Sequence, residues 1–402
     1  MKVYYITMLF PSPAETFACN DVSALSGMGV DVSVHSLRFK RPSTRKLAEE
    51  RGIEHICLSY NSVLNTLRGI LSAVIRPSLS FPAAVWICRH TLRTPFHFFK
   101  SFILFPRVLQ LYSEIERGNP DVVHLFWGHY PSILAYMVKK RLPDVLLSIS
   151  LGAYDMGISY GGSRDIIKKA DLITTFAKVN VKDLIELGAP PGKIQVIYRG
   201  IDREKYESWT GGISKIERKI ATAGRLIPGK GMRDALRVFS GINKKWPDSR
   251  LVVLGDGPLM DELKQLADSM GLAKRVAFAG HVPHEIVLKE LKSAEVFLFM
   301  SGYENERLPN AVKEALFCGC FTVAGDTPGI EELIPGVDYG AIVKPGDIAG
   351  AGDKIDAFFA EPGKFKGVTE NARRHVVHNF DVKNEMKKLK ESWDKLSAEK
   401  RI

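Results

Sequence analysis

Cysteine is scarce in this sequence and follows no recognisable pattern. Five cysteines are scattered over 402 residues, at Cys19, Cys57, Cys88, Cys318 and Cys320. Their number is odd, and the close pair near residue 320 has no second pair with which to form a zinc site. We therefore expect reduced thiols, as is usual in a cytosolic protein, rather than a disulfide framework.

The sequence also lacks the segments that would send it into or across a membrane. No apolar run approaches the roughly 20 residues that a membrane-spanning helix needs. The N-terminal stretch MKVYYITMLF has neither the basic start nor the small-residue cleavage site of a signal peptide. We expect a cytoplasmic protein.

Acidic residues are absent from one long stretch. Between His55 and Ser113 there is no Asp or Glu, although the stretch contains Arg68, Arg76, Arg89, Arg93, Lys100 and Arg107. Apolar residues recur at helical spacing from Val63 to Ile75, and FHFFKSFILFP mixes aromatic with basic side chains. The net charge of +11 also favours an anionic partner.

We therefore predict that residues 62–110 lie on an anionic membrane surface, at the inner face of the cell membrane. One alternative is that these helices belong to the N-terminal core and their arginines are simply solvated. Aromatic and basic side chains can also bind single-stranded nucleic acid. No nucleic-acid-binding motif accompanies them, so we predict no nucleic-acid partner.

Short apolar strands alternate with helices in both halves of the chain, which predicts an α/β protein with parallel, doubly wound sheets. The length favours two domains. The polar, glycine-containing stretch GIDREKYESWTGG interrupts the pattern between them. We predict domains at residues 1–202 and 203–380, with a charged helix at 381–402 that packs back on the N-terminal domain.

The stretch Ser301–Cys320 is typical of a strand end, a polar loop and a short helix. Pro309 is predicted at the first helical position, and Gly319 ends the helix. Glu306 then lies in the loop and Glu314 inside the helix, both near backbone N–H groups that favour anions. Such a site suits a ligand with phosphates and hydroxyls. The alternative is an ordinary surface helix with two solvated glutamates.

The stretch GRLIPGKG follows the predicted strand KIATA, at the sheet edge where open α/β sheets bind ligands. Arg225 can contact phosphate in bidentate fashion, and Lys230 adds a point charge. The glycine spacing is not that of a Walker loop. Taken alone, this is equally a routine βα loop. Combined with Glu306 and Glu314 at the same edge, it predicts cations that hold a diphosphate and carboxylates that hold hydroxyls.

The segments GRLIPGKGM, VVLGDGPLMDEL, VAFAGHVP, ENERLPNAVKEAL and TPGIEELI resemble the retaining glycosyltransferases of family 4 in order and spacing. The resemblance implies the GT-B fold, with two Rossmann-like domains facing a central cleft. It implies catalytic roles for Arg225, Lys230 and Glu306, the first two on the leaving diphosphate. Arg307 departs from the family, which often has glycine there. The substrate-binding residues that it implies in this half, Glu314 on the ribose among them, are Gly257, His281, Val282, Leu308, Pro309, Asn310 and Glu314.

The N-terminal half resembles the family more weakly. FPSPAETF stands at the acceptor loop, which implies that Glu15 and Thr16 bind substrate. Leu151 occupies the place of a family histidine near the reacting carbon, whereas Asp155 keeps the family's aspartate. His129 or His124 could compensate; for each, the alternative is a histidine with a structural role, buried in the case of His124.

The resemblance implies a hexosyltransferase that moves a sugar from a UDP- or GDP-sugar, with retained configuration. The acid-free stretch predicts a lipid-linked or saccharide acceptor, as in polysaccharide or glycolipid assembly. No Asp-x-Asp pair occurs, so we predict no metal and no cofactor. Two alternatives remain, a nucleotide-sugar epimerase of the same fold and a non-catalytic nucleotide-sugar-binding subunit.

Overall fold

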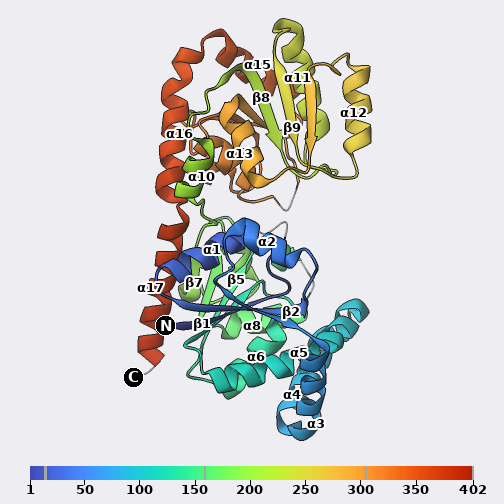
Figure 1. Cartoon of the computed structure of the whole chain (residues 1–402), viewed down its shortest axis with the longest axis vertical. Coiled ribbons are helices and arrows are strands. Elements are labelled where there is room, and N and C mark those ends of the chain that lie inside the picture. The colour runs from blue at the N-terminus through green and yellow to red at the C-terminus, as the bar shows by residue number, and fades with distance from the viewer. Residues whose placement is uncertain (13–15, 158–159, 304–305, 401–402) are drawn as a thin grey trace. The chain divides into compact units, whose positions relative to one another are not determined.

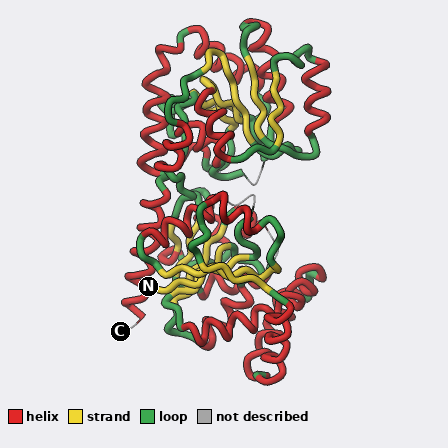
Figure 2. Tube along the Cα trace, viewed as in Figure 1, coloured by secondary structure: helices red, strands yellow, loops and turns green. Residues whose placement is uncertain are grey.

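The structure is a computed structural model that describes residues 1–12, 16–157, 160–303 and 306–400. The chain divides into two compact units (Figure 1). The first unit contains Met1–Gly200 and Val382–Ile402, and the second contains Ile201–Asp381. Each unit has a parallel sheet with helices on both faces (Figure 2). The predicted α/β class with two doubly wound sheets is therefore confirmed.

The first unit has a seven-stranded sheet of order β3-β2-β1-β4-β5-β6-β7. Its central strands β4 and β5 are wholly buried and mostly apolar, as expected for a sheet covered on both faces. The register places Tyr5 of β1 beside Val34 of β2 and His124 of β4. The strands are β1 (Lys2–Thr7), β2 (Asp31–Phe39), β3 (Cys57–Asn61), β4 (Val122–Phe126), β5 (Leu146–Leu151), β6 (Leu172–Thr175) and β7 (Ile194–Val196).

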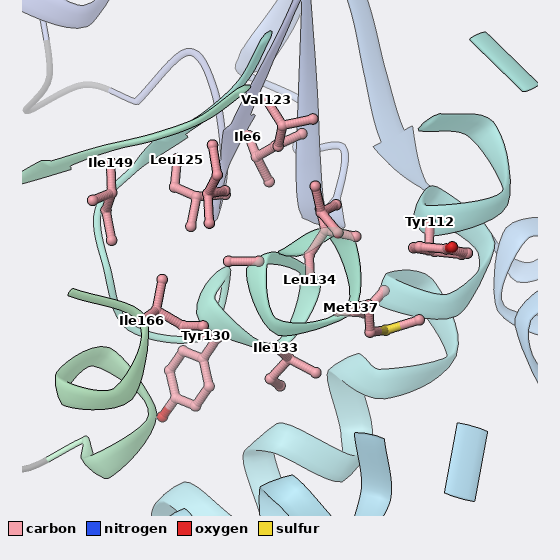
Figure 3. Packing of buried hydrophobic residues seen from close by; sticks show 14 of the residues in the cluster. Ile6, Tyr112, Val123, Leu125, Tyr130, Ile133, Leu134, Met137, Ile149 and Ile166 are labelled. Atoms are coloured by element: carbon pink, nitrogen blue, oxygen red, sulfur yellow. The ribbon is translucent and has the colours of Figure 1, made fainter. Parts of the chain in front are cut away.

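The helices of this unit pack on the sheet through apolar side chains. Figure 3 shows Leu134 pointing toward Ile6 and Val123 of the sheet, with Tyr112 of a neighbouring helix close by. The helices are α1 (Thr16–Gly27), α2 (Thr44–Arg51), α3 (Val63–Ile75), α4 (Pro77–Thr91), α5 (Pro95–Gly118), α6 (Ser132–Arg141), α7 (Ala153–Gly157), α8 (Gly161–Lys169), α9 (Asn180–Glu186) and α17 (Val382–Lys400).

The terminal helix α17 packs on the first unit through both its ends. Trp393 is fully buried with its ring centroid 5.4 Å from that of His124. The carboxylate of Glu385 accepts a hydrogen bond from the backbone N–H of Tyr198 at 2.8 Å. Near the end of the helix, Lys400 forms an ion pair with Asp171. The helix thus covers the sheet beside α1.

Helices α3, α4 and α5 stand together beside the sheet (Figure 1). Ser62 caps α3 by accepting a hydrogen bond from Asn65 N–H, as expected for an N-cap serine. A Cβ atom at Gly69 would lie 1.8 Å from the carbonyl oxygen of Pro106, so only glycine lets α3 approach α5 this closely. The predicted helix at 63–75 is confirmed.

No single helix in the described ranges is long and apolar enough to cross a membrane. Helices α3 and α4 together reach that length and composition, but the chain bends by 104° between them.

The second unit has a six-stranded sheet of order β10-β9-β8-β11-β12-β13. Its strands are β8 (Ile216–Ala223), β9 (Arg250–Leu254), β10 (Val276–Gly280), β11 (Ala294–Phe299), β12 (Phe321–Gly325) and β13 (Ala341–Val343). Its helices are α10 (Arg203–Thr210), α11 (Met232–Lys245), α12 (Met260–Ser269), α13 (His284–Ser293), α14 (Asn310–Phe317), α15 (Ile348–Ala360) and α16 (Lys366–Asn379). Strands β8 and β11 are parallel neighbours, so the loops after them share one edge.

Candidate active site

The carboxyl edge of the second sheet brings two predicted residues into contact. Lys230 lies in the loop after β8 and Glu306 in the loop after β11, and their side chains form an ion pair. The Lys230 Nζ also lies 4.8 Å from the ring centroid of Tyr303. Both charged side chains are largely buried, at 12% and 16% exposed, which strengthens their attraction relative to a surface pair. The ion pair thus holds the Lys230 ammonium group at the carboxyl edge of the second sheet.

Glycine makes the approach of these two loops sterically feasible. Gly231 has φ 69° and precedes α11, and a Cβ atom there would lie 1.9 Å from the carbonyl oxygen of Met300. The backbone N–H of Gly302 donates to the carbonyl of Gly229 at 3.0 Å. Any side chain at Gly231 would push the β11 end away and separate Lys230 from Glu306.

Arg225 follows β8 directly and is exposed. Within the described parts of the chain its side chain makes no hydrogen bond or ion pair. The backbone on either side is fixed, because Gly224 N–H donates to Leu254 O and Leu226 N–H to Asp256 O, both at 2.9 Å. The guanidinium is therefore an exposed cation on a fixed backbone, available to an anionic ligand.

Glu314 lies in α14 and is held by two residues that the sequence did not single out. His284 Nε2 lies 2.9 Å and Tyr206 OH 3.2 Å from its Oε1 atom. Neither contact uses Oε2, which has no hydrogen bond within the described ranges. Burial, and then the negative charge of Glu314, raise the pKa of Tyr206 well above its usual value. Tyr206 therefore stays protonated and donates, leaving Oε2 for a further donor.

The remaining predicted residues of this unit lie around that edge. Helix α14 begins at Asn310 and Pro309 is its N-cap, with an extended backbone. The prediction that Pro309 is the first helical residue was wrong, because its ψ of 122° is not helical. Leu308 is half-buried in the loop before it.

Three more predicted residues lie after β9 and β10. Gly257 packs against the backbone of Leu226, so a Cβ atom there would lie 2.5 Å from its carbonyl oxygen. Beyond β10, His281 is exposed and Val282 is half-buried. All three follow strands whose carboxyl ends lie at the same edge as that of β8.

In the first unit, Asp155 links the loops after β4 and β5. Its carboxylate accepts hydrogen bonds from Gly128 N–H at 2.9 Å and Gly152 N–H at 3.2 Å, and its Oδ1 lies 3.2 Å from His129 Nδ1. The Asp155 side chain is 1% exposed and that of His129 is 14% exposed. The carboxylate thus fixes the position of the imidazole.

Leu151 and His124 both lie in the interior of this unit. Leu151 is fully buried, and its Cδ2 atom would lie 2.3 Å from a Cβ atom at Gly128. His124 is buried between Ser148 and Ser150, whose hydroxyls lie 3.0 and 3.1 Å from its ring nitrogens. Burial lowers the pKa of His124 to about 3. Of the two histidines, only His129 lies at the sheet edge.

The first edge holds two further features that short motifs did not reveal. Arg199 has its guanidinium carbon 3.9 Å from the ring centroid of Phe17 and 4.1 Å from that of Phe176. Trp127, directly after β4, has φ 82°, which is strained for a bulky residue and typical of functional loops. The sequence alone does not single out Arg199, because its aromatic partners are far away in sequence.

The acceptor loop prediction is largely outside the described residues. Glu15 lies in the undescribed segment 13–15, and α1 begins at Thr16. The structure therefore neither supports nor contradicts roles for Glu15 and Thr16.

A hollow of about 330 Å³ in the second unit borders the loops after β8 and β11, since Gly229, Gly231 and Gly302 are among its lining residues. Its lining includes Ile227, Met232 and Arg233, but neither the Lys230–Glu306 pair nor Glu314. The two arginines that line it, Arg233 and Arg237, are already paired with Glu262 and Asp234. It does not coincide with the charged groups described above.

Two family models match the chain. One described as "Glycosyl transferases group 1" matches residues 205–375, and one described as "Glycosyltransferase Family 4" matches residues 14–205. The N-acetyl-alpha-D-glucosaminyl L-malate synthase of Bacillus anthracis is 25% identical over 280 residues, which cover 66% of this chain and 72% of that protein.

A second relative is the N-acetylgalactosamine-N,N'-diacetylbacillosaminyl-diphospho-undecaprenol 4-alpha-N-acetylgalactosaminyltransferase of Campylobacter jejuni. It is 31% identical over 181 residues, 44% of this chain and 47% of that protein. Among solved structures, Anabaena Alr3699/HepE in complex with UDP has the same fold, with a TM-score of 0.74 and 17% identity over 98% of this chain and 100% of that one. The two family models together span residues 14–375, and the chain therefore belongs to the glycosyltransferases of family 4, with the GT-B fold.

Proposed function

We propose that this glycosyltransferase moves a hexose from a nucleotide diphosphate sugar, UDP- or GDP-linked, with retained anomeric configuration. The observation that carries the proposal is the Lys230–Glu306 ion pair beside the unpaired Arg225 at the carboxyl edge of the second sheet. A diphosphate can take Lys230 away from Glu306 and recruit Arg225. The solved structure of similar fold with bound UDP supports a nucleotide-sugar donor.

The carboxylate of Glu306, once displaced from Lys230, can bind the sugar. Once Lys230 contacts the diphosphate, Glu306 is free to accept a hydrogen bond from a sugar hydroxyl, and Glu314 can accept one from the ribose through Oε2. As the glycosidic bond breaks, negative charge grows on the departing diphosphate. Arg225, Lys230 and the free N–H groups at the start of α14 would stabilise that charge.

We propose that the reaction needs no metal ion, because two side-chain cations supply the charge that a metal would otherwise provide. The sequence has no Asp-x-Asp pair. Turnover should be unchanged in excess EDTA, and a loss of turnover that Mg²⁺ or Mn²⁺ restores would contradict this part of the proposal.

In the first unit, we propose that His129 takes the place of the missing family histidine near the reacting carbon. Asp155 contacts Nδ1 of the His129 imidazole. The other ring nitrogen, Nε2, can then form a hydrogen bond with a hydroxyl of the sugar or acceptor. Leu151 cannot serve, because it is apolar and packed in the core.

A ligand screen tests the donor. The melting temperature of the full chain is measured with UDP-, GDP-, ADP- and CMP-sugars, because a ligand that binds only the folded state raises it. We expect a rise with a UDP- or GDP-sugar, and NMR of the product should show the donor's anomeric configuration. Absence of any shift with all four classes, or an inverted product, would contradict the proposal.

We propose a lipid-linked acceptor at the inner face of the cell membrane, as in polysaccharide or glycolipid assembly. Of 19 large apolar side chains that are exposed among the described residues, 13 lie in α3, α4 and α5 or between α4 and α5. On α3 only Gly69 is buried, so its apolar residues face outward. Large exposed apolar patches rimmed by basic residues are typical of membrane-contacting surfaces. The Campylobacter relative is named for a diphospho-undecaprenol substrate.

Vesicle flotation tests the membrane surface. The double variant Leu67→Ser/Leu71→Ser removes two side chains of α3 that are 57% and 58% exposed, so folding should be unaffected. We expect the wild type to float with anionic vesicles and the variant to lose most of this binding. The control Val337→Ser changes an apolar residue that is 84% exposed in the second unit and should float like the wild type. A wild type that stays at the bottom at low salt would contradict the proposal.

A further inference from the structure

Two basic residues, Arg38 and Lys100, lie on elements that contact each other at the first sheet, β2 and α5. Arg38 is the penultimate residue of β2, and its backbone N–H donates to Met8 O, beyond the end of β1. Helix α5 packs on β2 where Arg107 Nε donates to Ser36 O at 3.3 Å. Lys100 lies seven residues before Arg107, on the same face of α5. Its Nζ atom lies 4.6 Å from the ring centroid of Tyr130, which follows β4, so this end of α5 lies at the carboxyl edge of the sheet.

Neither cation has an anionic partner in the described parts of the chain. The Lys100 Nζ lies 4.6 Å from the ring centroid of Tyr130 and 5.1 Å from that of Phe96, but forms no ion pair. The half-buried Arg38 makes neither a side-chain hydrogen bond nor an ion pair. Burial and then the positive charge of Arg38 lower the pKa of Lys100. Two neighbouring cations without a counter-ion repel each other, and an anion bound between them would remove that cost.

Apolar side chains flank the two cations. Phe96, Phe99 and Ile103 follow an i, i+3, i+7 spacing on α5 and are 65 to 75% exposed. Lys100 lies four residues after Phe96 and three before Ile103, so it shares their side of the helix. Phe39, which follows Arg38, is 53% exposed. Positive charge with exposed aromatic and aliphatic surface on both sides is the pattern of an amphiphile-binding site.

We propose that Arg38 and Lys100 form a subsite for the phosphate of the lipid-linked acceptor, with its hydrocarbon chain lying along Phe96, Phe99 and Ile103. The inference rests on the proposed function, since it assumes that the acceptor is an amphiphile. The residues beside Lys100 support a subsite close to the proposed reaction centre. His97, one turn before Lys100, has its Nδ1 atom 2.8 Å from Tyr130 OH, and Tyr130 precedes α6 and follows His129. The subsite therefore adjoins the histidine proposed to act near the reacting carbon.

The test compares two vesicle types with the full chain. Phosphatidylcholine vesicles carry either a small fraction of a polyisoprenyl diphosphate or enough phosphatidylglycerol to give the same surface charge. We expect the wild type to bind the diphosphate vesicles about tenfold or more tightly than the phosphatidylglycerol vesicles, because two positioned cations recognise a phosphate better than a diffuse field does.

The test variant is Arg38→Gln/Lys100→Gln, and its matched control is Arg89→Gln/Arg93→Gln, which removes two exposed charges from the same acid-free stretch. The test variant should lose the preference while still binding phosphatidylglycerol vesicles. The control should bind both types more weakly by the same factor and keep the preference. Absence of a preference in the wild type, or equal behaviour of the two variants, would overturn the subsite.

Two further measurements separate the explanations. Inorganic pyrophosphate should compete only weakly with the diphosphate vesicles; full competition at similar concentration would mean a general anion site and overturn the lipid assignment. The donor melting shift is measured on the same samples. If it is absent, the proposed function fails; if it is present while the vesicle preference is missing, only this subsite fails.

Discussion

The carboxyl edges of the two sheets are arranged differently, although the sheets share a topology. At the second edge, polar side chains from neighbouring loops and helices contact each other, as in the Lys230–Glu306 ion pair and the hydrogen bond between His284 and Glu314. At the first edge, the carboxylate of Asp155 contacts two backbone N–H groups and His129, while Arg38 and Lys100 have no anionic partner among the residues that the structure describes. The second edge thus contains a cation together with its carboxylate partner, whereas the first edge contains cations without a carboxylate partner in the described residues.

This difference in charge pairing suggests a different ligand for each edge. A cation that exchanges a carboxylate partner for a diphosphate has a counter-charge both with and without ligand, which suits a donor that arrives and leaves in every cycle. Unpaired cations beside exposed apolar side chains instead favour an anionic amphiphile. The predictions below probe this contrast.

The largest effect should come from Lys230→Ala. Removal of a charge that stabilises the departing diphosphate should lower kcat by about 10²- to 10³-fold, in the range measured when one such donor is deleted. Steady-state kinetics with a saturating donor measures it. The melting temperature should also fall, because the largely buried Glu306 loses its counter-charge, so turnover is compared at a temperature where both proteins are folded.

Lys245→Ala is the matched control for that experiment. Lys245 also forms an ion pair, with Asp356, but on the surface of α11 away from the strand ends. Its removal should leave kcat within about twofold, since exposed pairs contribute little. If both variants were equally active, the second edge would not be the donor site.

Much of the second edge could be predicted from sequence, because its residues lie in short motifs that follow strands directly. Arg225, Lys230, Glu306 and Glu314 were placed at one edge by strand order alone, and the parallel β8–β11 pair explains why. Tyr206 was not found, because its contact with Glu314 joins residues 108 positions apart.

The first edge was less accessible to sequence reasoning. Its side chains come from β2, α5 and the loops after β4 and β5, and no local pattern indicates which of them meet. The acid-free stretch favours an anionic partner, and this stays a prediction; a missing residue type is visible without any knowledge of contacts. Pro309 was misplaced by one residue, as is common at helix ends.

The second largest effect should come from Asp155→Asn in the first unit. The amide can still accept from one backbone N–H, but it loses the charge and presents an N–H₂ group to Gly128 or Gly152 N–H. We expect the first unit to lose about 2 kcal/mol of stability, since a buried donor is left without an acceptor. Urea unfolding measures this, and the donor melting shift should persist.

His129→Gln is the companion variant that separates structure from chemistry. His129 contacts Asp155 but supports neither backbone N–H group, so stability should change by less than about 1 kcal/mol while turnover falls at least tenfold. Equal losses of stability in the two variants would indicate that His129 has only a structural role.

Acid should act on the first unit through its buried histidines. Burial lowers the pKa of His124 to about 3, and burial also lowers that of His35. His124 therefore stays neutral in the folded protein well below pH 6.5, whereas in the unfolded chain it binds a proton below that value. The unfolded state gains this proton as the pH falls, so stability is lost below pH 6.5 by about 1.4 kcal/mol per pH unit for His124, and His35 shifts stability in the same direction.

Urea unfolding between pH 6.5 and about 5 measures this loss, before most carboxylates titrate. His124→Asn should be less stable at neutral pH, because the hydroxyls of Ser148 and Ser150 lose partners, but its pH slope should be smaller by about one proton. An unchanged slope would show that His124 is protonated in the folded state.

The smallest effect should come from Tyr206→Phe, which tests whether the second edge is held in place by its own neighbours. The change removes the hydroxyl that donates to Glu314 Oε1 at 3.2 Å but keeps the ring, which packs beside Phe317 at 5.5 Å. His284 still holds the same oxygen at 2.9 Å, so the carboxylate keeps one support. One neutral donor to a carboxylate contributes about 1 kcal/mol, so KM for the donor should rise about threefold to fivefold, with kcat nearly unchanged. A fall in kcat instead would mean that Tyr206 orders the reacting groups, and that the second edge, like the first, depends on residues far apart in the chain.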